Sequence, residues 1–228
     1  MKSTAIVLAA GKGKRMNSSI HKQYLLLAGR PVICYSLETF QKCPFIDEII
    51  LVAGEGEEEY CRHEIAEKYG FDKVSRILPG GRERYDSVYA GLKAASGCDF
   101  VYIHDGARPF VDDKMLCRAR EAVEKYQACV VGMPVKDTIK VMDQEGFAAA
   151  TPERKSLFMV QTPQVFAYDV IRRAYDEVMS GENIQVTDDA MMVEKAMNIK
   201  VKLVEGSYEN IKITTPEDLR IAECFCAK

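Results

Sequence analysis

Glycines and basic residues follow one another directly after the first apolar run of the chain. Residues 8–16 read LAAGKGKRM, and His21-Lys22-Gln23 comes shortly after them. Small residues at a strand end let backbone N–H groups approach a ligand closely, and a nest of such groups suits a triphosphate. Arg15 and Lys22 add positive charge at two further points. In phosphoryl or nucleotidyl transfer a protein mainly positions the reactants and stabilises spreading negative charge, and this segment is suited to that chemistry.

Three other interpretations of these glycines compete with triphosphate binding. A Walker-type phosphate loop requires GxxxxGK followed by Ser or Thr, and the sequence has no such segment. A dinucleotide-binding fingerprint requires GxGxxG; Gly11 and Gly13 fit it, but Met16 occupies the third glycine position. An ordinary loop between a strand and a helix needs no ligand. The two glycines together with Arg15 and Lys22 favour anion binding.

A second glycine turn leads into a polar helix start at residues 80–92. The segment reads GGRERYDSVYAGL. Backbone groups at Gly81 and the hydroxyl of Ser87 are suited to reading the edge of a nucleobase. A capped amphipathic helix without a ligand explains the same pattern, and this segment alone does not decide between the two.

The third segment, Tyr102–Phe110, places a carboxylate at the end of an apolar strand. In open α/β sheets ligands bind outside the carboxyl ends of the strands, where we expect Asp105. Mg²⁺ usually takes one or two carboxylates together with substrate phosphates, so Asp105 is a candidate ligand. Arg108 suits bidentate contact with a phosphate, although an Asp–Arg pair that only fixes the loop is the alternative. We interpret His104 as a packed core residue.

Polar residues in the second half of the chain are candidates for binding a second substrate. Thr138 opens an extended stretch and Arg154 lies near its close. The residues Gln161–Gln164 are predicted to form a polar turn before a helix. Thr187 stands at a predicted helix start, where capping is the usual task, and Lys212 lies in a predicted short strand. Each alone can be structural, but together they supply hydroxyls and cations for a phosphate-bearing substrate.

Apolar runs alternate with helical patterns along most of the chain. This alternation, with nearly continuous apolar strands, predicts an α/β fold with a mostly parallel sheet covered by helices on both faces. We expect strands at Thr4–Ala9, Glu48–Ala53, Val74–Leu78, Phe100–His104, Ala128–Pro134, Val201–Glu205 and Ile211–Ile213. We expect helices at Val32–Phe40, Glu57–Tyr69, Tyr85–Ala95, Lys114–Lys125, Tyr168–Ser180, Asp188–Ala196 and Pro216–Phe225.

The rhythm changes between Val135 and Phe158. An extended stretch, a turn at Asp143–Gly146 and a second extended stretch predict a protruding hairpin or β-arm. The arm has little apolar mass to bury against its own domain, so we expect it to pack on a partner subunit. With neither repeats nor a linker in sight, we expect one domain over residues 1–228, with a dimerisation arm at about 135–158.

The composition excludes several classes of protein. A formal net charge of -3 leaves no basic excess for nucleic acid, so a polyanionic ligand must be held by a local cluster. No apolar run approaches the ~18 residues of a membrane span. The eight cysteines are scattered without CxxC or paired Cys/His spacing, as in reduced cytosolic proteins. We therefore expect a cytoplasmic protein that binds small molecules, and neither nucleic acid nor membrane.

Taken in order, these segments resemble the 2-C-methyl-D-erythritol 4-phosphate cytidylyltransferase family. The matching stretches run from Ala5 to about Leu219 and read AAGKGKRM, HKQYLLLAGRPV, GGRERYDSVYAGL, HDGARPFV, PVKDTIK, QTPQVF, TDDAMMVE and ENIKITTPEDL. The resemblance implies a Rossmann-like nucleotidyltransferase fold and a homodimer joined by the arm. It also implies transfer of CMP from CTP to 2-C-methyl-D-erythritol 4-phosphate, with release of pyrophosphate, in isoprenoid precursor synthesis by the non-mevalonate pathway.

The resemblance further implies a role for each matching residue. Arg15 and Lys22 would stabilise the transition state at the α-phosphate, and Asp105 would help to hold Mg²⁺ between the CTP phosphates. Arg154 and Lys212 would position the acceptor phosphate for the reaction. The CTP contacts would be Ala9, Ala10, Gly11, Gly13, Gly81, Ser87 and Ala107. The acceptor contacts would also include Arg108, Thr138, Thr162 and Thr187, with Thr138 and Arg154 reaching the neighbouring subunit's site.

Three rival functions share some of these features. A ribitol-5-phosphate cytidylyltransferase has the same fold, CTP and arm but another acceptor. A sugar-1-phosphate nucleotidyltransferase would use UTP or dTTP. A non-catalytic nucleotide-binding protein would keep the pocket without turnover, and the retained Arg15, Lys22 and Asp105 speak against it.

Overall fold

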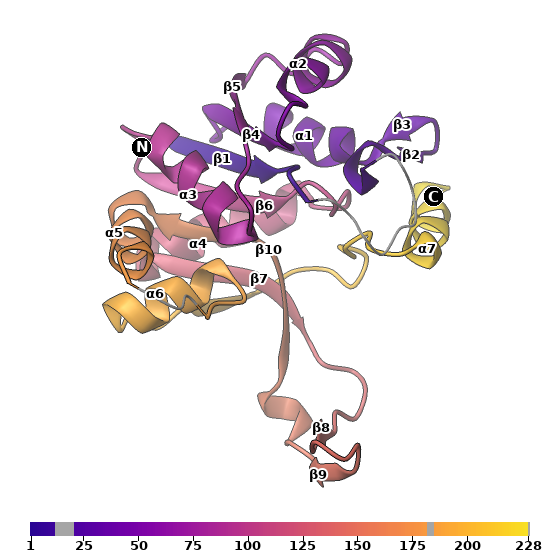
Figure 1. Ribbon diagram of the computed structural model, residues 1–228, viewed down its shortest axis with the longest axis vertical. Helices are drawn as coiled ribbons and strands as arrows, with labels where there is room; N and C mark the ends of the chain where they lie inside the picture. Colours follow the sequence, from indigo (N-terminus) through magenta and orange to yellow (C-terminus); the bar gives the residue numbers. More distant parts are fainter. Residues whose placement is uncertain (12–20, 182–184, 228) are drawn as a thin grey trace.

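A seven-stranded sheet forms the centre of the computed structural model, which describes residues 1–11, 21–181 and 185–227 (Figure 1). Its strand order is β11-β7-β10-β6-β1-β4-β5. The strands are β1 (Ser3–Leu8), β4 (Glu48–Ala53), β5 (Val74–Pro79), β6 (Phe100–Asp105), β7 (Ala128–Pro134), β10 (Phe158–Ala167) and β11 (Lys202–Glu205). The pairs β6·β1, β1·β4, β4·β5 and β11·β7 are parallel, whereas β10 runs antiparallel to both of its neighbours.

The inner strands β1, β4 and β6, together with β7, are buried on both faces, which explains their largely apolar sequences. Neighbouring side chains of β1 show the division: Ala5 and Val7 belong to one core cluster and Ile6 belongs to the other. The first cluster packs under α1 (Val32–Lys42), η3 (Cys61–Glu67) and α4 (Asp113–Tyr126). The second packs under α3 (Arg84–Ala94), α5 (Tyr168–Met179) and α6 (Asp189–Met197). The predicted α/β architecture with two helical layers is confirmed.

Shorter elements complete the described part of the chain. A small hairpin of β2 (Leu26–Leu27) and β3 (Arg30–Pro31) precedes α1, and the closing helix α7 (Pro216–Cys226) packs against it through a third, smaller apolar cluster. One predicted helix, Glu57–Tyr69, consists of the turn α2 (Glu58–Tyr60) followed by the π-helical η3. None of the helices in the described ranges has the length and apolar character required to cross a membrane.

Two local predictions are wrong. The residues Gln161–Gln164 do not form a turn; they lie inside β10, with a cis peptide bond before Pro163. The polar side chains of this strand suggested a turn, because their hydrogen-bond partners lie in distant segments of the sequence. Gln161, for example, donates to the Ser207 carbonyl. The predicted strand Ile211–Ile213 is also absent; the backbone there is irregular and is tied to the sheet end by Ile213 N–H donating to the Ala107 carbonyl.

The predicted arm is present as a protrusion at the far end of β7 and β10 (Figure 1). It carries the hairpin β8 (Val141–Met142) and β9 (Ala148–Ala150) and the short turn η4 (Arg154–Ser156). Its apolar side chains have no core of their own, and Met142 and Phe147 are 71% and 68% exposed. The arm therefore presents apolar surface away from the body that carries it.

Candidate active site

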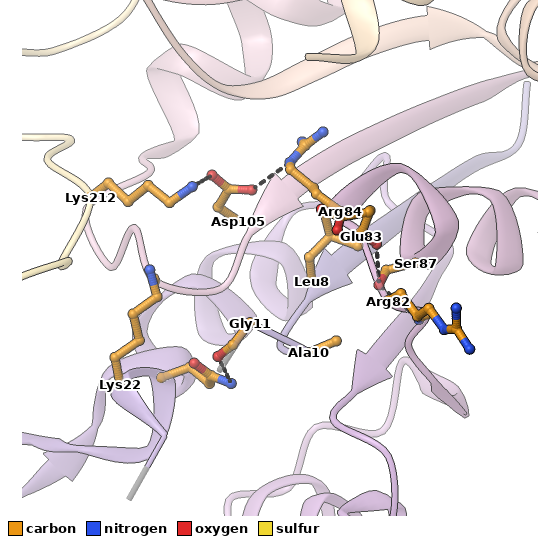
Figure 2. A pocket seen from close by; sticks show the side chains of 13 residues that line it. Leu8, Ala10, Gly11, Lys22, Arg82, Glu83, Arg84, Ser87, Asp105 and Lys212 are labelled. Carbon is orange, nitrogen blue, oxygen red and sulfur yellow. Dashed lines mark hydrogen bonds and ion pairs between the residues drawn. The ribbon is translucent and has the colours of Figure 1, made fainter. Parts of the chain in front are cut away.

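A cavity of about 470 Å³ opens where β1, β5 and β6 end at the same edge of the sheet (Figure 2). This is the edge at which ligands of open α/β sheets bind. Its lining contains four cationic side chains and two carboxylates, so positive charge is concentrated here although the whole chain is acidic. The lining residues are Leu8, Ala10, Gly11, Lys22, Gln23, Gly81, Arg82, Glu83, Arg84, Ser87, Asp105, Ala107 and Lys212.

The first wall of the cavity joins the glycine loop to the turn that carries Lys22. Gln23 is buried, and its side-chain amide donates to the backbone carbonyls of Ala9 and Gly11. Because both carbonyls accept hydrogen bonds from Gln23, the loop is fixed against η2 (Lys22–Tyr24), which contains this glutamine. Lys22 reaches into the same cavity from that turn (Figure 2). Gln23 is a site residue that the sequence did not single out, since a lone glutamine gives no signal.

Two of the predicted residues, Gly13 and Arg15, lie outside the described residues. Their roles stay predictions from the sequence.

The second wall is the turn between β5 and α3. Gly81 N–H donates to the Ser87 hydroxyl at 3.1 Å, and that hydroxyl lies 3.3 Å from the Glu83 carbonyl. A Cβ on Gly80 would stand 2.2 Å from the Cβ of Ala10, so the two walls touch where Gly80 has no side chain. The predicted pair Gly81 and Ser87 is thus brought together at the cavity, opposite the glycine loop.

Asp105 lies at the floor of the cavity and is surrounded by cations. Its carboxylate contacts Lys212 Nζ at 2.6 Å and Arg84 Nε at 3.2 Å, and Arg108 Nε lies 4.0 Å away. Burial alone would raise the pKa of this carboxyl, but Arg84, Lys212 and Arg108 hold it well below its usual range. Asp105 is therefore an anion throughout the ordinary pH range and joins three segments of the chain at one point.

A chain of hydrogen bonds supports Asp105 from below. Asp105 N–H donates to the Thr162 hydroxyl at 3.0 Å, and this hydroxyl lies 3.1 Å from His104 Nδ1. The other ring nitrogen of His104 lies 3.0 Å from the Arg108 carbonyl. A hydroxyl that donates to Nδ1 and an Nε2–H that donates to the carbonyl satisfy every partner with a neutral ring. Burial lowers the pKa of His104 to about 4, which agrees with a packed, neutral residue.

Arg84 is the main site residue that sequence reasoning missed. Besides Asp105, it contacts both carboxylate oxygens of Asp189 at 2.8 and 2.7 Å. Burial works to lower the pKa of Arg84, but Asp189 and Asp105 together raise it well above its usual value. A cation three residues after Gly81 was a possible signal, but Arg82 follows the glycine pair directly as well. Both arginines line the cavity, but only the structure shows that Arg84 is held by Asp105 and Asp189 whereas Arg82 is exposed.

The other predicted acceptor residues are not gathered at this cavity. Arg108 lies beside Asp105 but is tied to the Asn210 carbonyl at 2.8 Å, and Thr162 is buried beneath the floor. Thr187 is exposed at the start of α6. Thr138 and Arg154 lie on the arm, where Arg154 Nη1 donates to the Lys136 carbonyl at 2.9 Å. Of the acceptor residues predicted within the described ranges, only Lys212 lines the cavity.

The residues present fit a magnesium ion that is shared with a substrate. No group of three or more His, Cys, Asp or Glu side chains among the described residues forms an all-protein metal cage. A shared Mg²⁺ needs only one or two carboxylates, with substrate phosphates supplying further oxygens. Asp105 is such a carboxylate, since it is ionised and reaches a cavity large enough for a nucleotide.

Comparison with known proteins identifies the family. The family model for 2-C-methyl-D-erythritol 4-phosphate cytidylyltransferase matches residues 3–228. The chain belongs to this cytidylyltransferase family. The enzyme of that name from Lachnospira eligens is 52% identical over 224 residues, 98% of each chain. The one from Clostridium kluyveri is 50% identical over 224 residues, 98% of this chain and 96% of the relative.

Solved structures of the cytidylyltransferase family share the fold. The structure of 4-diphosphocytidyl-2C-methyl-D-erythritol synthase from Anaerococcus prevotii is 35% identical, with a TM-score of 0.87 over 99% of this chain and 98% of that one. The cytidylyltransferase from Thermus thermophilus is 30% identical, with a TM-score of 0.79 over 98% of each chain. These findings confirm the family, the Rossmann-like fold and the nucleotidyltransferase class that the sequence predicted.

Proposed function

We propose that this chain transfers CMP from CTP to 2-C-methyl-D-erythritol 4-phosphate, giving 4-diphosphocytidyl-2-C-methyl-D-erythritol and pyrophosphate in the non-mevalonate route to isoprenoid precursors. The observation that carries the proposal is one cavity at the strand ends that holds Lys22, Asp105 and Lys212 between two glycine turns. Membership of the cytidylyltransferase family specifies the nucleotide and the acceptor.

The proposed reaction is a direct displacement at phosphorus. An oxygen of the acceptor phosphate forms a bond to the α-phosphorus of CTP, and the bond from that phosphorus to the oxygen bridging to the β-phosphorus breaks. Pyrophosphate leaves with the electron pair of the broken bond. Negative charge spreads over the phosphoryl oxygens, and Lys22 from one wall would stabilise it, with Arg15 assigned to the same task from the sequence.

No strong general base is needed, because the attacking phosphate oxygen is already ionised near neutral pH. This agrees with the environment of His104, which is buried and hydrogen-bonded through both ring nitrogens. Burial lowers its pKa to about 4. Gly81 and Ser87 would face the base, and Ala9, Ala10, Gly11, Gly13 and Ala107 the ribose and phosphates. Asp105 would hold Mg²⁺ together with the substrate phosphates, and the ion when bound would neutralise phosphate charge.

We also propose that the chain acts as one domain that dimerises through its arm. Arg154 begins η4 and Thr138 precedes β8, so both belong to the arm that projects from the body, while Lys212, which has a related predicted role, lines the cavity. The exposed apolar residues Met142 and Phe147 suit an intersubunit contact. In such a dimer Arg154 and Thr138 would reach the partner's cavity, where the acceptor phosphate would also meet Lys212 of that subunit.

A reducing compartment such as the cytosol is the proposed place of work. All eight cysteines fall within the described residues, and every one of them is a free thiol. Disulfides are rare in reducing compartments, so unpaired thiols support this location.

The test is pyrophosphate release by the purified chain with Mg²⁺, CTP and methylerythritol phosphate. Parallel reactions with ribitol 5-phosphate, and with UTP or dTTP in place of CTP, measure the specificity for acceptor and nucleotide. We expect kcat/KM to be highest for CTP with methylerythritol phosphate by at least roughly 100-fold, since buried polar groups reject ligands that leave them unpaired. Faster turnover with ribitol 5-phosphate would reassign the acceptor, and CTP binding without turnover would refute catalysis.

A further inference from the structure

Asp189 is a fully buried carboxylate that the roles proposed above leave without a task. It is the first residue of α6, and it comes from a segment more than a hundred residues away from Arg84 in sequence. Its two oxygens accept from the two terminal nitrogens of Arg84 at 2.8 and 2.7 Å, and the Tyr175 hydroxyl donates to it at 2.6 Å. Such a two-pronged contact fixes the plane of a guanidinium as well as its position.

Capping of the helix does not explain this residue. The residue that caps α6 is its neighbour Asp188, whose carboxylate accepts from Met191 N–H. The Ala190 N–H is satisfied by Gln164, which also donates to Asp188. The start of the helix is therefore held by Asp188 and Gln164, and the Asp189 carboxylate is left for Arg84 and Tyr175.

The consequence of this contact lies at the cavity. With both terminal nitrogens held by Asp189, Arg84 approaches Asp105 through Nε alone, at 3.2 Å from Oδ1. The other oxygen of Asp105 contacts Lys212. An Arg84 released from Asp189 would be free to turn its two terminal nitrogens toward Asp105 and cover both oxygens. Asp189 thus limits how much of the Asp105 carboxylate Arg84 covers.

We propose that Asp189 is a positioning residue that acts through Arg84, keeping Asp105 oriented and accessible for the nucleotide-bound cation. The proposal rests on the proposed function, because it assigns Asp105 to a magnesium–CTP complex. It adds a buried link between α6, α3 and the floor of the cavity. Residues that orient a ligand to a metal typically change metal affinity or activity by about 10- to 100-fold when they are replaced.

The primary test compares Asp189→Asn with Asp188→Asn. The first change removes the charge that holds Arg84, whereas the second alters the neighbouring cap, where Asn is also a good residue. We expect Asp189→Asn to lower kcat by roughly tenfold or more, with the KM for methylerythritol phosphate within about twofold of wild type. Calorimetry should show that Mg²⁺ strengthens CTP binding less in Asp189→Asn than in wild type. Asp188→Asn should change neither quantity.

A double-mutant cycle then asks whether Asp189 acts through Arg84. In an Arg84→Gln background, Asp189→Asn should change kcat and the Mg²⁺-dependent gain in CTP affinity by less than about twofold. Multiplicative effects of the two changes would overturn the proposal. Equal losses in Asp188→Asn and Asp189→Asn would overturn it too, because they would point to damage at the helix start.

Two further comparisons keep the test decisive. If Asp189→Asn does not fold, Tyr175→Phe removes only the third contact of that carboxylate, and Tyr168→Phe is its control because Tyr168 donates to the Leu92 carbonyl instead. A measurably smaller Mg²⁺-dependent gain in Tyr175→Phe alone supports the proposal, and unchanged binding overturns it. Wild-type protein that binds CTP with Mg²⁺ but releases no pyrophosphate would refute the proposed function, while the calorimetric cycle would still decide the role of Asp189.

Discussion

Acidification should destabilise the fold through His104, whose ring supports the floor of the cavity. The ring is fully buried, and burial lowers its pKa from 6.5 to about 4. In the unfolded chain the ring takes up a proton near pH 6.5, whereas in the folded chain it stays neutral until about pH 4. The stability that depends on the neutral ring is therefore complete above the unfolded pKa and is lost progressively as the pH falls toward 4.

The size of this loss follows from the two pKa values. A difference of one pKa unit corresponds to ~1.4 kcal/mol, and proton linkage between the two values removes about 2 kcal/mol of folding free energy between pH 7 and pH 5. Protonation would also place a donor at Nδ1, where the Thr162 hydroxyl now lies at 3.1 Å. The bond from Asp105 N–H to that hydroxyl belongs to the same chain, so the cavity floor would be disturbed along with the core.

Urea unfolding at pH 7 and pH 5 measures this effect if wild type is compared with His104→Gln. Glutamine offers a donor and an acceptor like the neutral ring but takes up no proton in this range, so the variant should lose about 2 kcal/mol less than wild type. The matched control is His63→Gln: His63 is on the surface, Glu67 raises its pKa, and its effect on the pH dependence has the opposite sign. Equal losses in wild type and His104→Gln, or an NMR titration of His104 near pH 6.5, would refute the reasoning.

Three further predictions concern the cavity and the arm. Lys22→Ala should lower kcat by more than ~100-fold without loss of helical circular dichroism, whereas the surface change Lys68→Ala should not; near-normal kcat would contradict the role of Lys22. Arg154→Ala should mainly raise the KM for methylerythritol phosphate, and heterodimers of Arg154→Ala with Lys22→Ala should regain activity unless each site is built within one subunit. Gly80→Ala should raise the KM for CTP, because the added Cβ would lie only 2.2 Å from the Cβ of Ala10 and displace the glycine loop. Unchanged kinetics would contradict this prediction.

The strongest local patterns predicted their elements correctly because the residues that stabilise these elements lie within the same segment. The strand β4 (Glu48–Ala53) is apolar and buried at every position after Glu48, so composition alone indicates it. The helix α4 has an apolar stripe and begins after Asp112, whose carboxylate accepts from Met115 N–H. The two glycine turns were recognisable as well, since a close approach of the backbone requires glycine, which is visible in the sequence.

The strand β10 was not predictable, because its polar residues find their partners far away in sequence. Gln164 bonds to Asp188 and Ala190, and Thr162 bonds to Asp105. A buried polar residue with a distant partner has the same local pattern as a residue in an exposed loop. The antiparallel insertion of β10 between β6 and β7 depends on such contacts.

By itself, the sequence determined the α/β class, the family, the glycine turns and the identity of the charged residues Lys22, Asp105 and Lys212, because these follow from residue type, periodicity and order. Only the tertiary structure decided how those charges meet. It placed Lys212 on Asp105, separated Arg84 from Arg82, joined Arg84 to Asp189 and left Arg154 on a projecting arm. The physical reason is that the energy of a buried charge depends on distances of a few ångströms between segments that lie far apart in the chain.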